Sequence, residues 1–413
     1  MNNICADLEC TGCMACMNAC NHQAISLGVD NEGFYRPIIN LEKCTDCALC
    51  SKVCPANKPF LEEKENKVTQ MAYSAWSQDE STRLNSSSGG AFTEFAKHVL
   101  QKGGVVFGVV LDEKLVARHS YIEKECDLYL MQGSKYVQSS VDYSYKKAKS
   151  YLKQGVDVLF SGTPCQIDGL KRFLGHHYYN LFTVDFVCHG VPSPLIFEEY
   201  KSYIEAKNCF KISDVKFRCK KYSWIFFNIL IKGNVEKEKG LEKEYIGTYY
   251  QDPYIRGFLR DNFLRPSCYN CKYASLKRPA DITIADWWGY QKRSKLDKNF
   301  EEKGVSLILV NTIKGITVFE KVKSNFVFRV RTLEEALKTN KSLKTSFPKP
   351  KTRNEFWNDY KKVPFSQLVQ KWMASEKVPL YLLLRSKYTH NYFFNLCASF
   401  LKNYCRILHR ISK

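Results

Sequence analysis

The chain has 413 residues, of which 45% are apolar and 14% aromatic, so it is long enough for two or three folded domains and too apolar for a disordered protein. No basic start leads into an apolar run, and no apolar stretch reaches the roughly 18 to 20 residues that cross a bilayer. Residues 1–70 carry six Lys/Arg and nine Asp/Glu, so within the net charge of +20 the other 343 residues carry +23. We expect a cytoplasmic protein whose basic body attracts an acidic redox partner, a small anionic substrate or the inner face of a membrane. No nucleic-acid recognition motif occurs.

Two cysteine runs of identical spacing open the chain. The first is Cys10, Cys13, Cys16 and Cys20; the second is Cys44, Cys47, Cys50 and Cys54. This spacing is typical of ferredoxins with two [4Fe–4S] clusters, in which the fourth cysteine of each run ligates the other run's cluster. The pattern therefore predicts an α+β ferredoxin-type dicluster domain over residues 1–60, with Cys54 completing the first set and Cys20 the second.

Two other interpretations of these cysteines are weaker. Zinc sites generally use one tetrad drawn from two separated pairs, which does not explain two matched runs of four. Disulfides are disfavoured because the chain has no export signal. Cys5 lies outside the pattern and is interpreted as a spare thiol, and Asn21 stands where a proline usually follows the first run.

A polar stretch, residues 61–70, is interpreted as a linker to a body over residues 71–345. Within the body, Ala91 to Gln101 has helical periodicity, and Val105 to Leu111 is typical of a strand. Val156 to Phe160 and Leu181 to Val187 are similar short apolar strands, each followed by a loop that holds Gly, Pro and Cys. Alternating strands and helices predict an α/β fold for the body.

The last segment, residues 346–413, has thirteen Lys/Arg against three Asp/Glu and is predicted to be a basic helical extension. Phe393, Cys397, Phe400 and Tyr404 recur at helical spacing, with Lys402 and Arg406 among them. Such a helix packs on its own domain, or lies on a membrane surface or a partner.

Several segments of the body together resemble one protein family. They are NSSSGGAF (85–92), GSKYVQSS (133–140), FSGTPCQ (160–166), VCHGVPSP (187–194) and the stretch 265–289, which contains CYNC and ADITIADWWG. The chain over residues 1–340 is similar to the β-subunit family of coenzyme F420 hydrogenase/dehydrogenase, a group of iron–sulfur flavoproteins. The resemblance implies a flavin-binding body that holds FAD.

The resemblance places FAD among three stretches. The small residues Ser87, Ser88, Gly89 and Gly90 precede a helix, where backbone N–H groups favour a phosphate, although without the family an ordinary serine-rich N-cap is the favoured explanation. The second stretch contributes Gly133, Ser134, Lys135, Tyr136, Gln138 and Ser139, and the third contributes Gly162, Thr163 and Pro164. No GxGxxG fingerprint or P-loop occurs, so a standard dinucleotide fold or an NTPase is not supported.

Four further cysteines fall on loops of the body: Cys165, Cys188, Cys268 and Cys271. They predict a third tetrathiolate site, most simply a third [4Fe–4S] cluster. A structural zinc at the same residues, or a redox-active Cys165 beside the flavin, are the alternatives. His189 is a candidate proton donor because its ordinary pKa is near neutrality, and a hydrogen-bonded structural histidine is the competing interpretation.

Taken together, these features predict an oxidoreductase. Single electrons from a ferredoxin or another acidic carrier would pass through the clusters, and FAD would convert them to a two-electron reduction of a substrate, or the reverse. Related bacterial proteins often accompany surface-polysaccharide genes, so a glycan precursor is one candidate substrate. The alternatives are a non-catalytic electron-transfer subunit of a hydrogenase or dehydrogenase, and a cluster-bearing scaffold or sensor.

Overall fold

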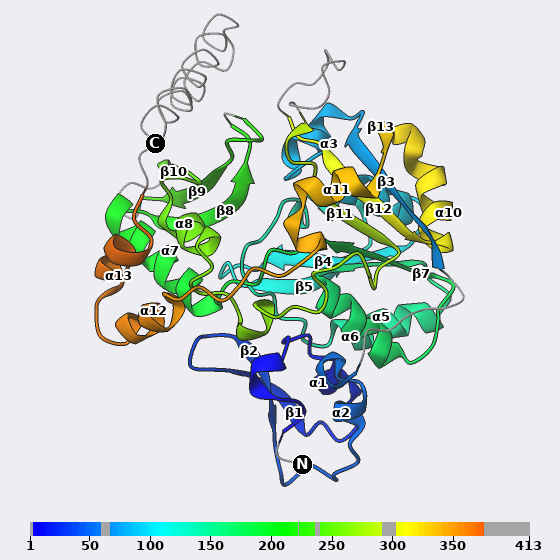
Figure 1. Cartoon of the computed structure of the whole chain (residues 1–413), viewed down its shortest axis with the longest axis horizontal. Coiled ribbons are helices and arrows are strands. Elements are labelled where there is room, and N and C mark those ends of the chain that lie inside the picture. Colours follow the sequence, from blue (N-terminus) through cyan, green and yellow to red (C-terminus); the bar gives the residue numbers. More distant parts are fainter. Residues whose placement is uncertain (1–2, 59–66, 222, 236–239, 291–302, 376–413) are drawn as a thin grey trace, which may run out of the picture.

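The computed structural model describes residues 3–58, 67–221, 223–235, 240–290 and 303–375. The described chain has three parts, which are an N-terminal module, a large mixed sheet with helices on its faces, and a small sheet with its own helices (Figure 1). No helix among these residues is long and apolar enough to cross a membrane.

The N-terminal module repeats one local structure, once for each cysteine run. α1 (Ala15–Ala19) and α2 (Leu49–Lys52) each begin after a residue in the left-handed region, Met14 (φ 57°) and Ala48 (φ 58°). β1 (Ile25–Val29) and β2 (Tyr35–Ile39) form an antiparallel pair between the helices. The predicted ferredoxin-type module is confirmed, and the matching backbone shows that equal cysteine spacing gives equal loops.

The large sheet has eight strands in the order β13-β3-β12-β11-β7-β6-β4-β5. Its parallel centre is formed by β4 (Val105–Leu111), β6 (Val158–Gly162), β7 (Leu181–Phe186) and β11 (Ile282–Asp286). Antiparallel strands flank it, namely β3 (Lys67–Ser77), β5 (Ala117–Ile122), β12 (Ser306–Thr312) and β13 (Phe326–Arg331). The predicted strands match β4, β6 and β7 to within two residues at each end, and β3 begins inside the stretch expected to be a linker.

Helices cover both faces of this sheet. Successive strand residues point to opposite faces, so the apolar strands present side chains to a core on each face. On one face Val106 and Leu159 pack with α4 (Ala91–Leu100) and α10 (Ile313–Val322). On the other, Phe107 and Phe160 pack with α5 (Ser144–Lys153) and α6 (Pro164–Leu174), and this core continues into the N-terminal module through Met14. The shorter helices α3 (Glu80–Asn85) and α11 (Leu333–Thr339) lie near β3. The body is therefore the mixed α/β fold that the sequence predicts.

The small antiparallel sheet comprises β8 (Lys211–Cys219), β9 (Asn228–Asn234) and β10 (Glu242–Thr248). It shares a core with α7 (Pro194–Asn208), α8 (Pro253–Leu259), α12 (Arg353–Tyr360) and α13 (Phe365–Trp372). Phe356 and Leu368 are fully buried in that core, so residues 353–372 are part of the body's packing. The basic helix expected around Phe393 lies outside the described residues.

Candidate functional site

The cysteines of the N-terminal module form two groups, each of which contains members of both runs. Cys20 lines one cavity together with Cys44, Cys47 and Cys50. Cys54 instead stands with the first three cysteines of the other run. Burial raises the pKa of Cys16, and the nearby thiols of Cys13, Cys10 and Cys54 raise it further. The fourth cysteine of each run thus crosses to the other group, as a dicluster ferredoxin requires.

Cys5 lies against one of these groups. Its thiol is hydrogen-bonded to Cys10 and Cys54, and this contact lowers the pKa of Cys10 to about 6 and that of Cys54 to about 7. The segment that carries Cys5 is held by Asn57, whose Nδ2 donates to the Ile4 carbonyl oxygen at 2.7 Å. Cys5 is therefore a fifth thiol beside the group, placed by contacts that the spacing of the runs does not reveal.

The four cysteines of the body also lie together. Burial raises the pKa of Cys188, and Cys268, Cys165 and Cys271 add to the shift in that order. Cys165 is the second residue of α6, directly after β6, and Cys188 follows β7 by two residues. Because β6 and β7 are neighbouring parallel strands, their carboxyl ends meet at one edge of the sheet. The loop with Cys268 and Cys271 comes to the same edge.

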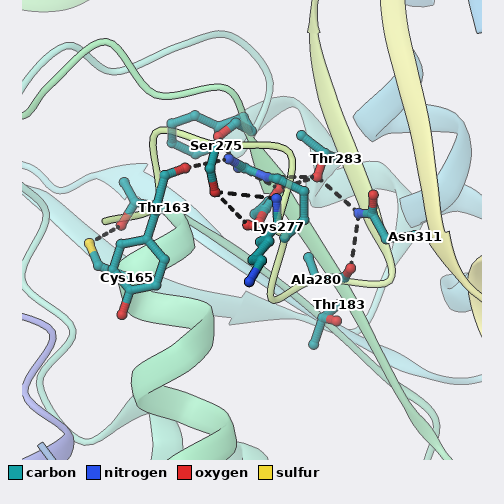
Figure 2. A network of polar contacts seen from close by, with 12 residues as sticks. Thr163, Cys165, Thr183, Ser275, Lys277, Ala280, Thr283 and Asn311 are labelled. Atoms are coloured by element: carbon teal, nitrogen blue, oxygen red, sulfur yellow. Dashed lines mark hydrogen bonds and ion pairs between the residues drawn. The ribbon is translucent and has the colours of Figure 1, made fainter. Parts of the chain in front are cut away.

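A buried ion pair fixes that loop. Arg278 Nη2 lies 2.9 Å from Asp185 Oδ1 on β7, and its Nη1 donates to the Tyr273 carbonyl oxygen at 2.9 Å. Thr283 on β11 donates to the same carboxylate, and Asn311 Nδ2 donates to Thr283 Oγ1 and to the Ala280 carbonyl oxygen, both at 3.0 Å (Figure 2). The network ties the residues after Cys271 to three strands of the sheet, β7, β11 and β12.

A second anchor joins the loop to α6. The Tyr273 hydroxyl donates to Asp168 Oδ2 at 2.6 Å, and the other oxygen of Asp168 accepts from Arg172 at 2.8 Å. The side chain of Asp168 is completely buried. Since Asp168 lies on the same helix as Cys165, this contact holds the two halves of the body's cysteine group together.

The N-terminal module docks at this edge of the sheet (Figure 1). A Cβ on Gly169 of α6 would lie only 2.9 Å from Cys13 Sγ, so the glycine lets the first cysteine group approach the helix. Ser267 Oγ donates to the Cys10 carbonyl oxygen at 3.0 Å, which links the two cysteine groups through one side chain. Arg353 of α12 holds both carboxylate oxygens of Glu32 on the hairpin of the module.

Arg265 lies between the two cysteine groups. Its guanidinium Nη2 is 3.7 Å from Cys165 Sγ and 3.8 Å from Cys268 Sγ, and its Nε donates to Ser267 Oγ at 3.0 Å. The residue is 5% exposed. The buried guanidinium of Arg265 thus faces the sulfurs of Cys165 and Cys268. It lies on the side of the body's cysteine group that faces the N-terminal module.

The residues predicted to bind a flavin separate into two sets. In the first, Ser87 Oγ accepts hydrogen bonds from the backbone N–H of Ser134 at 2.7 Å and from its hydroxyl at 2.9 Å, so two stretches 47 residues apart meet. Ser88 donates to the Val305 carbonyl oxygen, Gly89 has no room for a Cβ beside Ala75, and Gly90 adopts φ 93° before α4. These last three shape the loop and leave Ser87 and Ser134 facing each other.

The second set serves other contacts. Gln138 uses both ends of its amide on the backbone of Tyr35 in the N-terminal module, and Ser139 lies 3.1 Å from His119 Nδ1. Thr163 is the N-cap of α6 in a capping box, with Pro164 as the first helical residue after Gly162. These side chains hold the docking edge together, so their local surroundings favour a structural role.

Lys135 and His189 are each held by a neighbour. Lys135 Nζ donates to the carbonyl oxygens of Leu130 and Gln132, and burial lowers its pKa to about 7; Gly133 beside it is exposed. His189 Nε2 lies 2.6 Å from Asp261 Oδ1, and its ring lies against Phe347 at a centroid distance of 3.9 Å. A histidine held by a carboxylate in this way is fixed in orientation, as either a proton donor or a structural residue would be.

Two basic residues at the Ser87 loop were not predicted. Arg218, at the end of β8, pairs with Asp286 at 2.6 Å and is buried, yet its Nε and Nη2 have no hydrogen-bond partner. Tyr136 lies beside this guanidinium, and the ring of Trp288 lies beneath it at 5.2 Å. Lys220 Nζ donates to the Ser88 carbonyl oxygen at 2.6 Å. Both lie about 130 residues from the loop in sequence, and no local motif marks them.

Among the described residues, no group of three or more His, Cys, Asp or Glu side chains is placed to hold one metal ion. A [4Fe–4S] core has four irons between its thiolates, so its ligand sulfurs stand farther apart than those around a single ion. The three groups of four cysteines, two of them with crossed fourth members and one facing a buried arginine, fit such clusters.

Models of known families match three stretches of the chain. Those of the coenzyme F420 hydrogenase/dehydrogenase beta subunit match residues 72–144 (N-term) and 156–336 (C terminus), which together exceed half of the chain. The chain belongs to this beta subunit family. A 4Fe-4S dicluster domain matches residues 9–58. The resemblance seen in the sequence is confirmed, and this member of the family is an iron–sulfur electron-transfer protein of an oxidoreductase family.

One curated relative and one solved structure extend the comparison. The coenzyme F420-dependent sulfite reductase of Methanocaldococcus jannaschii is 23% identical over 316 residues, which are 76% of this family member and 46% of that protein. The chain thus spans about half the length of this relative. A chain of the F420-reducing [NiFe] hydrogenase complex from Methanosarcina barkeri aligns with a TM-score of 0.40 at 16% identity, over 70% of this chain and 99% of that one.

Proposed function

We propose that this protein passes single electrons between the tip of its N-terminal module and its body through three [4Fe–4S] clusters, and that the body binds a flavin. A distal cluster would be held by Cys20, Cys44, Cys47 and Cys50, and a proximal one by Cys10, Cys13, Cys16 and Cys54. The third would be held by Cys165, Cys188, Cys268 and Cys271. When bound, the clusters supply one-electron transfer and the flavin supplies exchange between one- and two-electron chemistry.

The observation that carries this proposal is the convergence of the four body cysteines beside the proximal group. Cys13 packs against α6, whose second residue is Cys165, and Ser267 joins Cys10 to the loop of Cys268. Cys165 therefore acts in our proposal as a cluster ligand, because it is one of four convergent thiols. A buried Arg265 that faces two of these sulfurs favours an anionic group there over neutral thiols.

The flavin is proposed to lie at the Ser87 loop. Ser87 and Ser134 present hydroxyl groups, and the free Nε and Nη2 of Arg218 are buried donors that need an acceptor. An anionic or carbonyl-rich ligand such as a flavin phosphate or the flavin ring would supply one. The same charge favours a small anionic substrate, and His189, oriented by Asp261, is the proposed proton donor.

The electron donor or acceptor is proposed to meet the distal cluster. Cys47 is exposed, so this group of cysteines lies at the surface. A ferredoxin or a similar one-electron carrier has the chemistry for such an exchange. The basic body would add attraction for an acidic carrier.

A second candidate function is an electron-transfer module without its own substrate. It is favoured by the partial match to the sulfite reductase. The matched region makes up only 46% of that protein, so about half of the relative lies outside it. Turnover of a two-electron acceptor by the isolated chain with an artificial donor would support the first candidate, whereas reduction that needs an added catalytic protein would support the second.

The cluster assignment is tested by counting iron and flavin after anaerobic purification and reconstitution. We expect about twelve iron atoms and one flavin in the wild type, at four iron per cluster. Cys268→Ser with Cys271→Ser should hold about eight, and the control Cys126→Ser, an exposed cysteine, about twelve. Arg218→Met should keep the iron and lose the flavin. About eight iron atoms in the wild type would overturn the third cluster, and flavin retained by Arg218→Met would overturn the placement of the flavin.

A further inference from the structure

Arg265 has an environment that its packing alone does not explain. Its side chain is buried, and none of the ion pairs in the described part of the chain gives it a carboxylate partner. The groups that its nitrogens reach are Cys165 Sγ, Cys268 Sγ and Ser267 Oγ. Burying a guanidinium costs several kcal/mol unless an anion compensates it. The compensating charge must therefore come from the cysteine sulfurs.

The position of the arginine is also directional. A Cβ placed on Gly12, in the loop between Cys10 and Cys13, would lie 3.4 Å from Arg265 Nη1. Ser267 accepts from Arg265 Nε and donates to the Cys10 carbonyl oxygen, both at 3.0 Å. The guanidinium therefore has contacts toward both groups, with Nη1 near the loop of the proximal group and Nη2 toward the sulfurs of the third.

We propose that Arg265 is a positioning residue that raises the reduction potential of the third cluster by donating charge-assisted hydrogen bonds to the sulfurs of Cys165 and Cys268. This inference rests on the proposed third cluster. Hydrogen bonds to ligand sulfurs and nearby positive charge both stabilise the reduced, more negative form of a cluster. In the step that this favours, the proximal cluster loses one electron and the third cluster gains it, with no bond made or broken.

The test is an EPR-monitored redox titration of the iron-loaded protein and of Arg265→Gln, with iron counted on the same samples. The glutamine removes the charge and keeps a donor of similar length. We expect the reduction equilibrium of the third cluster to weaken about tenfold, a shift of about 59 mV to lower potential for one electron, with the distal cluster unchanged. In the control Arg118→Gln, which changes a surface arginine paired with Asp112, the potentials of all three clusters should stay unchanged.

The outcomes separate the two proposals. About eight iron atoms in the wild type would overturn the third cluster itself. About twelve in both proteins with an unshifted third potential would overturn only the role of Arg265. If Arg265→Gln loses four irons, Arg265→Lys decides. If Arg265→Lys retains the cluster at a potential near that of the wild type, the positive charge has the proposed role. If Arg265→Lys also loses the cluster, the role of Arg265 is purely structural.

Discussion

Arg278 and Asp185 form a buried ion pair whose loss should be costly. Their side chains are 1% and 0% exposed, and Arg278 also bonds the Tyr273 carbonyl oxygen and Thr283 Oγ1. Removing one partner leaves a buried charge without compensation, which typically costs about 3 to 5 kcal/mol, a large share of the roughly 5 to 15 kcal/mol of a folded domain. Arg278→Met should lose stability by this amount and release the loop that follows Cys271.

The assay is anaerobic urea unfolding followed by tryptophan fluorescence, with iron counted before unfolding. Lys338→Ala breaks an exposed pair with Glu334 and should change the free energy of unfolding by no more than about 0.5 kcal/mol. Adding Asp185→Asn to Arg278→Met should recover part of the loss, because the stranded carboxylate is then neutral. Since burial raises the pKa of Asp185 even beside Arg278, the deficit of Arg278→Met should be larger at pH 8 than at pH 5. A deficit under 1 kcal/mol, or one that the added Asp185→Asn deepens, would refute this reasoning.

Three further perturbations test the docking edge and a buried carboxyl. Gly169→Val should push Cys13 away from α6 and lower the iron content by about four; an iron content equal to that of the wild type would contradict the contact. Glu32→Gln should weaken the hold of Arg353 on the N-terminal module and speed limited proteolysis between the module and the body. Glu80→Gln, which breaks an exposed pair with Lys303, should leave the rate of proteolysis unchanged. Burial raises the pKa of Asp252 to about 6, so the ionisation of this carboxyl should cost stability as the pH rises from about 4 through 6. Asp252→Asn should reduce the dependence of the urea midpoint on pH over this range. An unchanged dependence would contradict a raised pKa of Asp252.

Much of the fold follows from local pattern. The equal spacing of the two cysteine runs gives two equal loops, down to the left-handed residues Met14 and Ala48. Short apolar runs such as Val105–Leu111 become strands because both faces of the sheet are covered. The place of Cys165 and Cys188 after parallel strands is likewise visible in the sequence.

Other parts depend on long-range contacts that no local pattern records. Arg265 is 100 residues from Cys165, and Arg218 is 68 residues from Asp286, so neither charge reveals its partner in the sequence. Gln138 lies in a stretch that resembles a flavin site, yet its amide pairs with the backbone of Tyr35, 103 residues away. A side chain that can serve a ligand or a domain interface is assigned only when its neighbours are known.

The same limit applies to the segment after residue 345. Its net positive charge and helical spacing predicted a basic helical extension, but charge describes the exposed face of a helix and does not show what the buried face packs against. Phe356, Trp357 and Leu368 place α12 and α13 in the core of the small sheet. Arg353 on the same segment reaches back to Glu32, so this segment also secures the N-terminal module.

The relay of electrons through three clusters to a flavin is tested most directly by an anaerobic reductive titration that counts electrons taken up per chain. Three clusters that accept one electron each and a flavin that accepts two predict uptake of about five electrons, falling to about four in Cys268→Ser with Cys271→Ser. Uptake of about two electrons by the wild type, unchanged in that variant, would contradict both the third cluster and the flavin.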